Sequence, residues 1–352
     1  MRLMEKKSSI LVLAFILGFA SFSCSSDDDD NEVIVVNKTE LASKINEAQT
    51  LLDSTEEGTA EGQYERGSQT ALKEVVDLAQ LVNDDSESTQ IAVDNTVLSL
   101  DAATDEYMTK VIVPIAPEDL VGHWTFDDGA GSVLTDFSGN GFNGELKDGS
   151  ESWGGSLPIW TTDRYGNEGK ALNFDLGAHV NIPYTTAINP SQMSISVWVK
   201  ADESLESNRF MGLHSWNGFK FQLQAANKPF FTAATSDGIF DKDSDPALDL
   251  DVWYHLVVTA GNGEMVFYVN GTETQRWDDV AGTMAQVSGH DLVFGQGSSQ
   301  YAATTENYDN DKIIPLDWGG YFHGSLDEIR IYKSILSSSQ VTSIYELEKV
   351  EE

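Results

Sequence analysis

Residues 321–332 read Tyr-Phe-His-Gly-Ser-Leu-Asp-Glu-Ile-Arg-Ile-Tyr, an alternation of apolar and polar side chains that predicts a β-strand closing a sheet. The apolar positions of this strand include Phe322, Leu326, Ile329 and Ile331. Asp327 lies inside the same strand, where a carboxylate costs free energy unless a partner neutralises it. A hard cation is one such partner, and Arg330 or a backbone amide is another.

The sequence from residue 120 to this strand repeats the same period of two in short runs. Apolar residues alternate with polar ones in residues 194–200 and again in residues 219–224. Glycine-rich turns separate such runs, as in the hairpin signals Gly261-Asn262-Gly263-Glu264 and Asn270-Gly271. Many short strands joined by such turns predict a two-sheet antiparallel sandwich of the jelly-roll kind.

Residues 38–112 instead show a helical period, with apolar side chains three and four positions apart. Three stripes of this kind occur: Leu41, Ile45, Ala48 and Leu52; Leu72, Val75, Ala79 and Val82; Val93, Val97, Leu100, Tyr107 and Val111. A glycine-rich segment and an Asn-Asp-rich segment separate the stripes. The pattern predicts a three-helix antiparallel bundle, after which Pro114 and Pro117 mark a stiff linker.

The composition excludes some classes of partner. The chain has 352 residues and a formal net charge of −36. Nucleic acids and anionic lipid headgroups need a basic protein surface, so neither is an expected partner. Cys24 is the only cysteine, so no disulfide within the chain can stabilise the core.

The first residues predict a targeting segment. Lys6 and Lys7 precede an apolar run, residues 10–20, that has the length of a signal peptide and is too short for a comfortable membrane span. Cys24 follows this run, and residues 27–30 are consecutive aspartates that self-repulsion keeps solvated. A plain charged tether is one interpretation of these aspartates.

The same segment resembles a bacterial lipoprotein signal, in which the cysteine becomes the acylated N-terminus. The acidic run also resembles the export signal of surface lipoproteins of Bacteroidetes-type bacteria. Together these resemblances imply an outer-membrane lipoprotein that is exposed on the cell surface and held by a lipid anchor at Cys24.

Three segments before the closing strand resemble a known family. They are residues 120–144, LVGHWTFDDGAGSVLTDFSGNGFNG, residues 194–200, SISVWVK, and residues 251–270, DVWYHLVVTAGNGEMVFYVN. Their order is similar to that of laminin-G-like domains in the concanavalin A-like lectin and glucanase superfamily. The helical segment, with Gly-Thr-Ala-Glu-Gly-Gln-Tyr at residues 58–64, resembles the FIVAR-type bundles of bacterial surface proteins, which serve mainly as spacers.

The predicted fold class is therefore a multi-domain chain, with a small all-α three-helix bundle followed by an all-β, concanavalin A-like jelly-roll sandwich. The predicted boundaries are a signal peptide at 1–23, an acidic tether at 24–37, the bundle at 38–112, a linker at 113–118, the jelly roll at 119–345 and a tail at 346–352. In this order the bundle would hold the sandwich away from the membrane.

Carboxylates near the predicted first and last strands favour a structural calcium site. Asp127 ends the first strand, Asp136 lies in the following glycine-rich loop, and Asp327 lies in the last strand. Ca²⁺ takes about six to eight oxygen ligands from carboxylates and backbone carbonyls. The first and last strands run side by side in jelly rolls of the resembled family, which implies that Asp127 and Asp327 converge. Resemblance to laminarinase-type folds also implies the carbonyl of Gly177 as a ligand.

Aromatic and amide side chains predict a sugar-binding face. Sugar rings present apolar C–H faces that stack on aromatic rings, and their hydroxyls bond to amides and charged groups. Trp198 alternates with the apolar residues of its strand, as Lys220, Gln222 and Gln224 do in theirs. We expect these four side chains to share one face of adjacent strands, with Trp216 as one wall of a saccharide groove. Ordinary core packing is the alternative for each tryptophan.

The predicted function is capture of a polysaccharide or oligosaccharide without cleavage. Glycosidases need two carboxyl groups across the scissile bond, and laminarinase relatives carry them in an E-x-D-x-x-E strand. The sequence has no such string. One alternative is a glycoside hydrolase or lyase with a site built from loop residues such as Asp237, Asp241, Asp243 and Glu306. The other is a protein-binding adhesion module.

Overall fold

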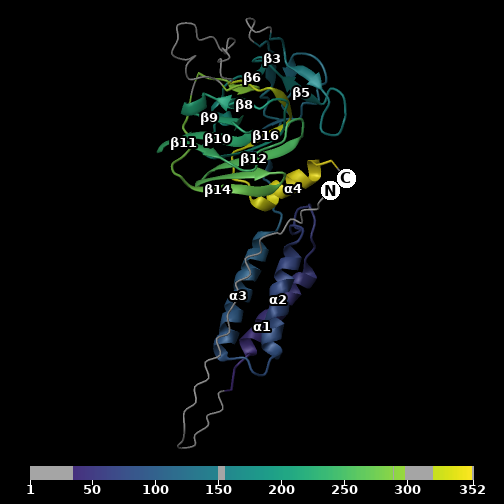
Figure 1. Ribbon diagram of the computed structural model, residues 1–352, viewed down its shortest axis with the longest axis vertical. Helices are drawn as coiled ribbons and strands as arrows, with labels where there is room; N and C mark the ends of the chain where they lie inside the picture. Colours follow the sequence, from purple (N-terminus) through teal and green to yellow (C-terminus); the bar gives the residue numbers. More distant parts are fainter. Residues whose placement is uncertain (1–34, 150–154, 288, 298–319, 351–352) are drawn as a thin grey trace, which may run out of the picture.

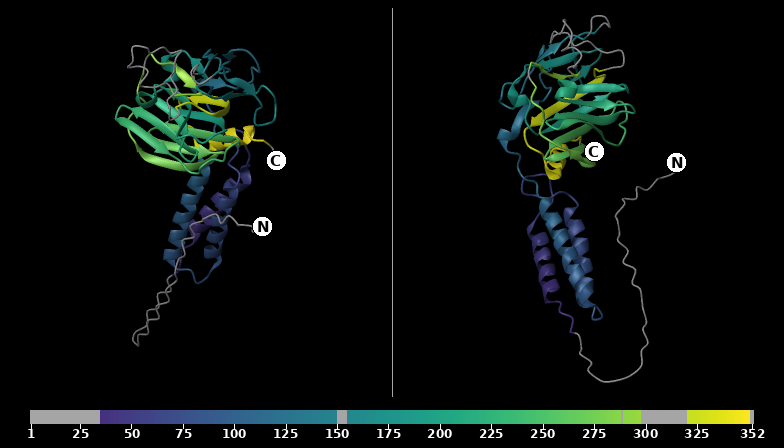
Figure 2. Two further views of the ribbon diagram at one scale, coloured as in Figure 1. Left: turned by 45° about the horizontal axis from the view of Figure 1, so that its top comes forward. Right: turned by 90° about the vertical axis from the view of Figure 1, so that its left-hand side faces the viewer.

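The computed structural model describes residues 35–149, 155–287, 289–297 and 320–350 (Figure 1). A stalk of three helices extends from one side of a sheet-rich domain (Figure 1, Figure 2). The two parts meet beside a fourth helix, α4 (Ser338–Glu348). The predicted signal peptide, Cys24 and Glu306 lie outside the described residues.

The stalk consists of α1 (Thr39–Ser54), α2 (Ser68–Asp84) and α3 (Gln90–Thr109). Each helix buries one apolar stripe, because residues three and four apart lie on the same face of a helix. The buried residues are Leu41, Ile45, Ala48, Leu72, Val76, Ala79, Val93, Val97, Leu100 and Tyr107. The three-helix part of the predicted fold class is thus confirmed. Within the described part of the chain, no helix combines the length and apolarity that a membrane crossing requires.

The sheet-rich domain is a sandwich of two antiparallel sheets, which confirms the predicted jelly-roll class. Sheet I contains, in spatial order, β14 (Thr272–Val280), β13 (Gly263–Val269), β12 (Tyr254–Gly261), β7 (Met193–Ala201), β16 (Gly324–Tyr332), β5 (Ala171–Phe174) and β4 (Ile159–Thr161), with β1 (Leu120–Trp124) also paired to β16. Sheet II contains β11 (Gly238–Asp243), β10 (Lys228–Thr235), β9 (Phe219–Gln224), β8 (Ser207–Leu213), β15 (Leu292–Phe294), β6 (His179–Ile182), β3 (Gly144–Lys147) and β2 (Val133–Leu134).

Aromatic side chains from both sheets fill the space between them. The largest buried rings are Trp124, Phe126, Phe174, Phe210, Phe219, Phe221, Phe231, Phe267, Phe294 and Phe322. Trp124 of β1 packs edge-on against Phe294 of β15, with 5.0 Å between ring centroids, so these rings connect the two sheets. Burial of each such ring stabilises the sandwich by roughly 1.5–3 kcal/mol.

The central strand of sheet I is β16, which pairs with β7 on one side and with β5 and β1 on the other. Its register against β7 shifts between Asp327 and Arg330, where Glu328 has a φ of 50°. Asp327 therefore lies opposite Trp198, and Arg330 lies opposite Ser196. Because opposed residues share a face, the bulge turns both charged side chains to the outer face of sheet I.

Helix α4 covers part of that outer face. Its apolar residues Val341 and Ile344 belong to a buried cluster with Val257, Val266 and Tyr268 of sheet I. A capping box between Ser337 and Gln340 defines its first turn. The capping box thereby fixes the residue at which α4 begins.

The last residue of α4, Glu348, anchors the helix to sheet I. Its carboxylate accepts a hydrogen bond from Trp198 Nε1 at 2.8 Å and pairs with Arg330. Its backbone carbonyl accepts a hydrogen bond from Arg164 Nε at 2.8 Å. The Tyr165 hydroxyl donates to the same carbonyl, so Glu348 accepts hydrogen bonds from four residues, whose donors would cost free energy if they were buried without an acceptor.

Helix α4 also contacts the stalk. Ser343 Oγ donates to the carbonyl of Thr59 at 2.7 Å, and Ser339 Oγ donates to the carbonyl of Val111 at 3.2 Å. Arg66 and Glu346 form an ion pair at 3.2 Å. The stalk and the sandwich are therefore joined through α4 as well as through the linker.

Glu348→Ala is expected to lower the free energy of unfolding by about 2–4 kcal/mol, because it removes a buried partner of Arg330 and the acceptor of Trp198. Urea denaturation followed by tryptophan fluorescence measures the loss. Glu264→Ala is the control, since it breaks an exposed ion pair with Arg276 and should cost less than about 1 kcal/mol. Equal losses in the two variants would contradict an anchoring role for Glu348.

Candidate functional site

Trp198 does not share a face with the predicted polar residues of β9, so that prediction is wrong. Strand β7 belongs to sheet I and β9 to sheet II, and the two strands do not pair. The Trp198 side chain is 4% exposed, lies against the rings of His255 and Tyr345 and donates to Glu348. It is therefore packed beneath α4, which makes it a structural residue.

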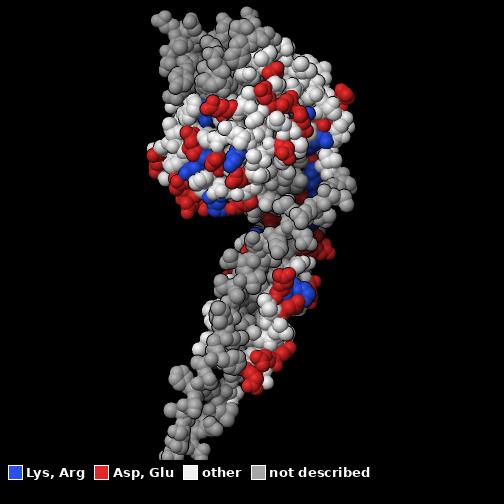
Figure 3. Space-filling view, viewed as in Figure 1, with Lys and Arg blue, Asp and Glu red and all other residues white. Residues whose placement is uncertain are grey.

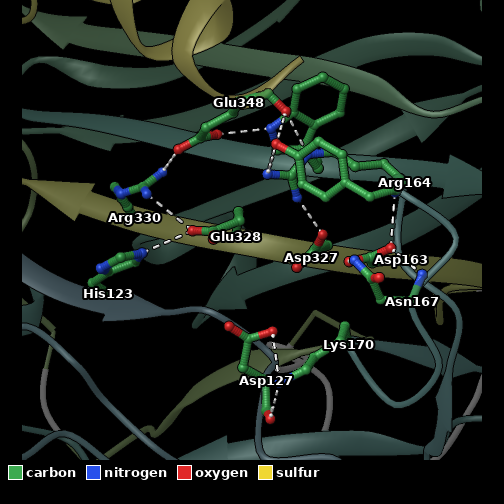
Figure 4. Close-up of polar contacts among 12 residues, drawn as sticks. His123, Asp127, Asp163, Arg164, Asn167, Lys170, Asp327, Glu328, Arg330 and Glu348 are labelled. Atoms are coloured by element: carbon green, nitrogen blue, oxygen red, sulfur yellow. Dashed lines mark hydrogen bonds and ion pairs between the residues drawn. The ribbon is translucent and has the colours of Figure 1, made fainter. Parts of the chain in front are cut away.

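A polar network lies on the same outer face of sheet I (Figure 4). Arg164, from the loop after β4, pairs with Asp327. Glu328 lies 2.8 Å from His123 Nε2 and 3.0 Å from Arg330. Burial raises the pKa of the Asp327 carboxyl, whereas the guanidinium of Arg164 acts in the opposite direction. Both acidic residues of β16 in this network thus have basic partners, and for Asp327 that partner is neither Arg330 nor a backbone amide.

A cavity of about 290 Å³ opens beside this network. Its lining includes Asp127 and Asp327, which the family resemblance implied to converge, together with Arg164 and Lys170. Lys170 Nζ lies 3.5 Å from the Asp127 carboxylate, and Arg164 pairs with Asp327 (Figure 4). Each carboxylate therefore already faces a basic side chain.

The other two predicted calcium ligands, Asp136 and Gly177, do not line this cavity. The Asp136 carboxylate accepts hydrogen bonds from three backbone amides and from the Ser138 hydroxyl. Burial acts to raise the pKa of Asp136, but these hydrogen bonds outweigh it and hold the pKa below its ordinary value. The carbonyl of Gly177 accepts a hydrogen bond from Gln296 Nε2 at 2.6 Å.

The predicted calcium ligands are thus not assembled into one site. A calcium ion bound by Asp327 would have to displace Arg164, whose guanidinium is its direct partner. Among the residues that the structure describes, no group of three or more His, Cys, Asp or Glu side chains is placed to hold a metal ion. A structural calcium therefore stays a prediction, and the contacts of these residues do not support it.

The outer face of sheet II carries two rows of side chains that cross its strands. Residues paired in register lie on the same face of a sheet. The first row is Arg209 of β8, Gln222 of β9 and Phe230 of β10; the second is Lys220 of β9, Thr232 of β10 and Asp241 of β11. We call the surface formed by these six residues and Trp216 the β9 face.

The alternation of β9 positions the centre of this face. Its apolar residues enter the core between the sheets, so Lys220, Gln222 and Gln224 point outward. The structure therefore brings these three predicted residues together. Gln222 Oε1 lies at their centre and accepts hydrogen bonds from Ser207 Oγ at 3.2 Å, Arg209 Nε at 3.3 Å and Lys220 Nζ at 3.3 Å.

Trp216 reaches the β9 face from η4 (Ser215–Asn217), the short turn between β8 and β9. His214 and Ser215 have φ angles of 53° and 41°, a left-handed conformation that non-glycine residues rarely adopt. Strain of this kind persists only where the surrounding structure enforces it, and it gathers at functional sites. The half-buried indole lies 4.9 Å from the Arg209 guanidinium and 4.6 Å from the Lys220 ammonium.

Two cations are buried on the β9 face. Lys220 is 3% exposed and Arg209 is 2% exposed. Burial and then the charge of Arg209 lower the pKa of Lys220 to about 7, while Asp241 opposes the shift. Burial lowers the pKa of Arg209 to about 10, again against the effect of Asp241. Both positively charged side chains thus lie in a buried environment, where the charged form of a side chain costs free energy.

Sequence reasoning missed Arg209, Phe230 and Thr232. The register of β8 against β9 shifts between Arg209 and Met211, so the alternation around Arg209 is irregular. The run 228–235, just after a turn, was the available signal for Phe230 and Thr232. Asp241, which sequence reasoning placed in a loop, lies in β11.

Comparisons with known proteins give one match to a family model and weaker likenesses. Residues 174–342 match the family model of the Concanavalin A-like lectin/glucanases superfamily. A gellan lyase of Bacillus sp is 37% identical over 87 residues, which are 25% of this chain and 4% of that protein. The chain thus spans only a small part of the curated relative that it matches.

Among solved structures, domain 4 of AbnA, a GH43 extracellular arabinanase from Geobacillus stearothermophilus in complex with arabinotriose, has 21% sequence identity and a TM-score of 0.47, over 64% of this chain and 98% of that one. The binding domain of Paraclostridial Mosquitocidal Protein 1 has 14% identity and a TM-score of 0.47, over 65% of this chain and 52% of that one. The family match extends from the end of β5 into α4, and so includes β9 and β16. The part of the sandwich from the end of β5 into α4 is therefore similar to domains of the concanavalin A-like lectin/glucanases superfamily.

Proposed function

We propose that the β9 face binds a polysaccharide or oligosaccharide and does not cleave it. The observation that carries this proposal is the placement of the Trp216 ring against Lys220, whose ammonium donates to Gln222. A half-buried indole offers a surface for the C–H face of a sugar ring, and the amide, hydroxyl and charged groups beside it suit sugar hydroxyls. All these groups except Trp216 stand on strands, which hold a binding site in place better than loops do.

The carboxylates of this face support binding rather than glycoside hydrolysis. The two-carboxylate mechanism needs its groups on either side of the sugar, about 5–9.5 Å apart. Asp241 accepts a hydrogen bond from the Thr232 hydroxyl, and Asp243 accepts one from Gln224 Nε2. Both stand on β11, the edge strand of sheet II, and strands β8 and β9 carry no carboxylate that could face them.

We also propose that this binding occurs at the cell surface. In this proposal Cys24 carries a lipid anchor in the outer membrane, and residues 24–37 form an acidic tether. The sequence resemblance of the first thirty or so residues to a lipoprotein signal supports it. The stalk, which extends from one side of the sandwich, suits a spacer between membrane and polysaccharide (Figure 2).

Trp216→Ala is expected to weaken polysaccharide binding by about fivefold or more, because an aromatic contact contributes about 1 kcal/mol. Affinity electrophoresis against a panel of soluble polysaccharides measures the change. Trp198→Ala is the matched control, and should lower the melting temperature while leaving affinity within about twofold below that temperature. Loss of binding in folded Trp198→Ala but not in Trp216→Ala would overturn this assignment. Release of sugar products by the wild type would contradict the non-catalytic part.

Lys220→Met is expected to raise the free energy of unfolding by about 1–3 kcal/mol at pH 7, because it removes a buried ammonium. The pKa of Lys220 is about 7 in the folded protein against an ordinary 10.5. Between these values the unfolded chain binds more protons, so the stability of the wild type rises with pH. The advantage of the variant should be full below pH 7 and vanish towards pH 10.5.

Urea titrations of both proteins across this pH range test the prediction. Lys228→Met is the control, since Lys228 forms an ion pair with Asp245 and should show no such pH-dependent gain. A difference in the free energy of unfolding between Lys220→Met and the wild type that stays constant from pH 6 to about pH 10 would contradict this prediction. It would show that burial does not disfavour the charged form of Lys220 in the folded protein.

Cys24→Ser is expected to leave the stalk and the sandwich folded and to release the protein from the membrane fraction, because the acyl chains supply the anchoring free energy. Fractionation of cells, followed by a thermal melt of the released protein, measures both effects. Ser25→Ala serves as the control. A variant that stays in the membrane fraction would contradict the proposed anchor.

A further inference from the structure

Lys220 differs from most other basic residues of the protein in lacking an acidic partner. Most described Lys and Arg side chains form ion pairs: Lys44, Arg66, Lys73, Lys110, Lys147, Arg164, Lys170, Lys228, Lys242, Arg276, Arg330 and Lys349. On the face of the sandwich in Figure 3, basic side chains lie among more numerous acidic ones. Lys220 forms no ion pair with any described residue, although the chain has a net charge of −36. Lys38, Lys200 and Lys333 likewise form no ion pair among the described residues, but none of them is buried as Lys220 is.

The contacts of Lys220 leave its charge uncompensated. Its ammonium lies 3.3 Å from Gln222 Oε1, 4.6 Å from the Trp216 ring and 4.6 Å from the Phe230 ring. Its cross-strand neighbours are Gly212, which has no side chain, and Thr232. An amide oxygen and two rings solvate an ammonium only in part, since each is a dipole or a quadrupole and not a full charge.

The nearest carboxylate of the β9 face does not supply the missing charge. Asp241 stands two strands from Lys220, beyond Thr232 in the same row, and the Thr232 hydroxyl donates to it. The Asp241 carboxylate is exposed at the edge of sheet II, where water screens its field. Arg209 adds a second buried positive charge on the other side of Gln222.

A neutral sugar bound here would offer hydroxyl groups to Lys220, which is already only 3% exposed, and would return no charge. Its hydroxyls would replace hydrogen bonds, but the desolvation of the ammonium would remain. An anionic group on the sugar would instead form charge-assisted hydrogen bonds, which are about twice as strong as neutral ones. Binding of an anion would therefore convert a destabilising feature of the free protein into an attractive contact.

Building on the proposed function of the β9 face, we infer that its saccharide ligand is acidic, with a carboxylate or sulfate group that contacts Lys220 beside Trp216. The sugar ring lies against the indole, and the anionic oxygens face the Lys220 ammonium. Both anionic groups offer the same acceptor chemistry to this donor. The proposal requires no cleavage of the polymer.

Matched polymer pairs test the inference with the full chain. Polygalacturonate is compared with its methyl-esterified form, and sulfated dextran is compared with dextran, by isothermal titration calorimetry or affinity electrophoresis. The wild type is expected to bind at least one acidic polymer about tenfold or more tighter than its neutral counterpart, as a charged hydrogen bond predicts. A difference within the first pair would indicate a carboxylate on the ligand, and a difference within the second pair would indicate a sulfate.

Variants of Lys220 show whether the charge acts through this residue. Lys220→Gln should lose about tenfold or more in affinity for the acidic polymer, and Lys220→Arg should retain most of it. Lys228→Gln, which removes a charge from neighbouring β10, should remain within about twofold of the wild type. Thermal melts of each variant confirm that it is folded at the temperature of the binding measurement.

The possible outcomes separate this inference from the proposed function. Binding of the neutral polymers with equal or greater affinity, unaffected by Lys220→Gln, would overturn the acidic ligand and leave carbohydrate binding intact. Binding of no polymer in a broader polysaccharide panel would overturn the proposed function itself. Equal losses in Lys220→Gln and Lys228→Gln would reduce the effect to the net charge of the chain and would also overturn the inference.

Discussion

Glu348 joins the end of α4 to Trp198, Arg330 and Arg164. This contact holds α4 against the outer face of sheet I, so the outer faces of the two sheets differ. A two-sheet sandwich has two outer faces, and each must be solvated, covered or used for binding. Helix α4 covers part of the outer face of sheet I, and its Glu348 pairs with Arg330. In the proposed function the ligand binds at the outer face of sheet II, where Arg209, Lys220 and Gln222 are themselves buried.

The outer faces of the two sheets differ in whether their buried charged side chains form ion pairs. On sheet I, Asp327 and Glu328 each have a basic partner, and such pairs roughly balance their desolvation cost against attraction. On sheet II, Lys220 has an amide and two rings instead of a carboxylate. An ion pair between two buried side chains favours the one arrangement of the folded chain that brings them together. A buried cation without an acidic partner lowers the stability of the free protein.

The sequence predicted the fold better than the site. Periods of two and of 3.6 depend on neighbouring residues, so the strands, the helices and the outward direction of Lys220 and Gln222 followed from local pattern. Membership of a sheet depends on long-range pairing, and for this reason Trp198 was assigned to the wrong face. The partner of Asp327 was missed for the same reason, since Arg164 lies 163 residues earlier in the chain. Arg209 was missed because a register shift interrupts the alternation of its strand.

The position of β16 also determines the order in which the chain can fold during synthesis. The stalk helices make contacts close in sequence and can form as soon as they leave the ribosome. Strands β1, β5 and β7 emerge long before β16, the strand that lies between them. Until residues 324–332 emerge, sheet I is open at its centre and exposes unpaired strand edges, which favour aggregation. A ribosome that stops before Gly324 would therefore release a chain with a folded stalk and a sandwich that cannot close.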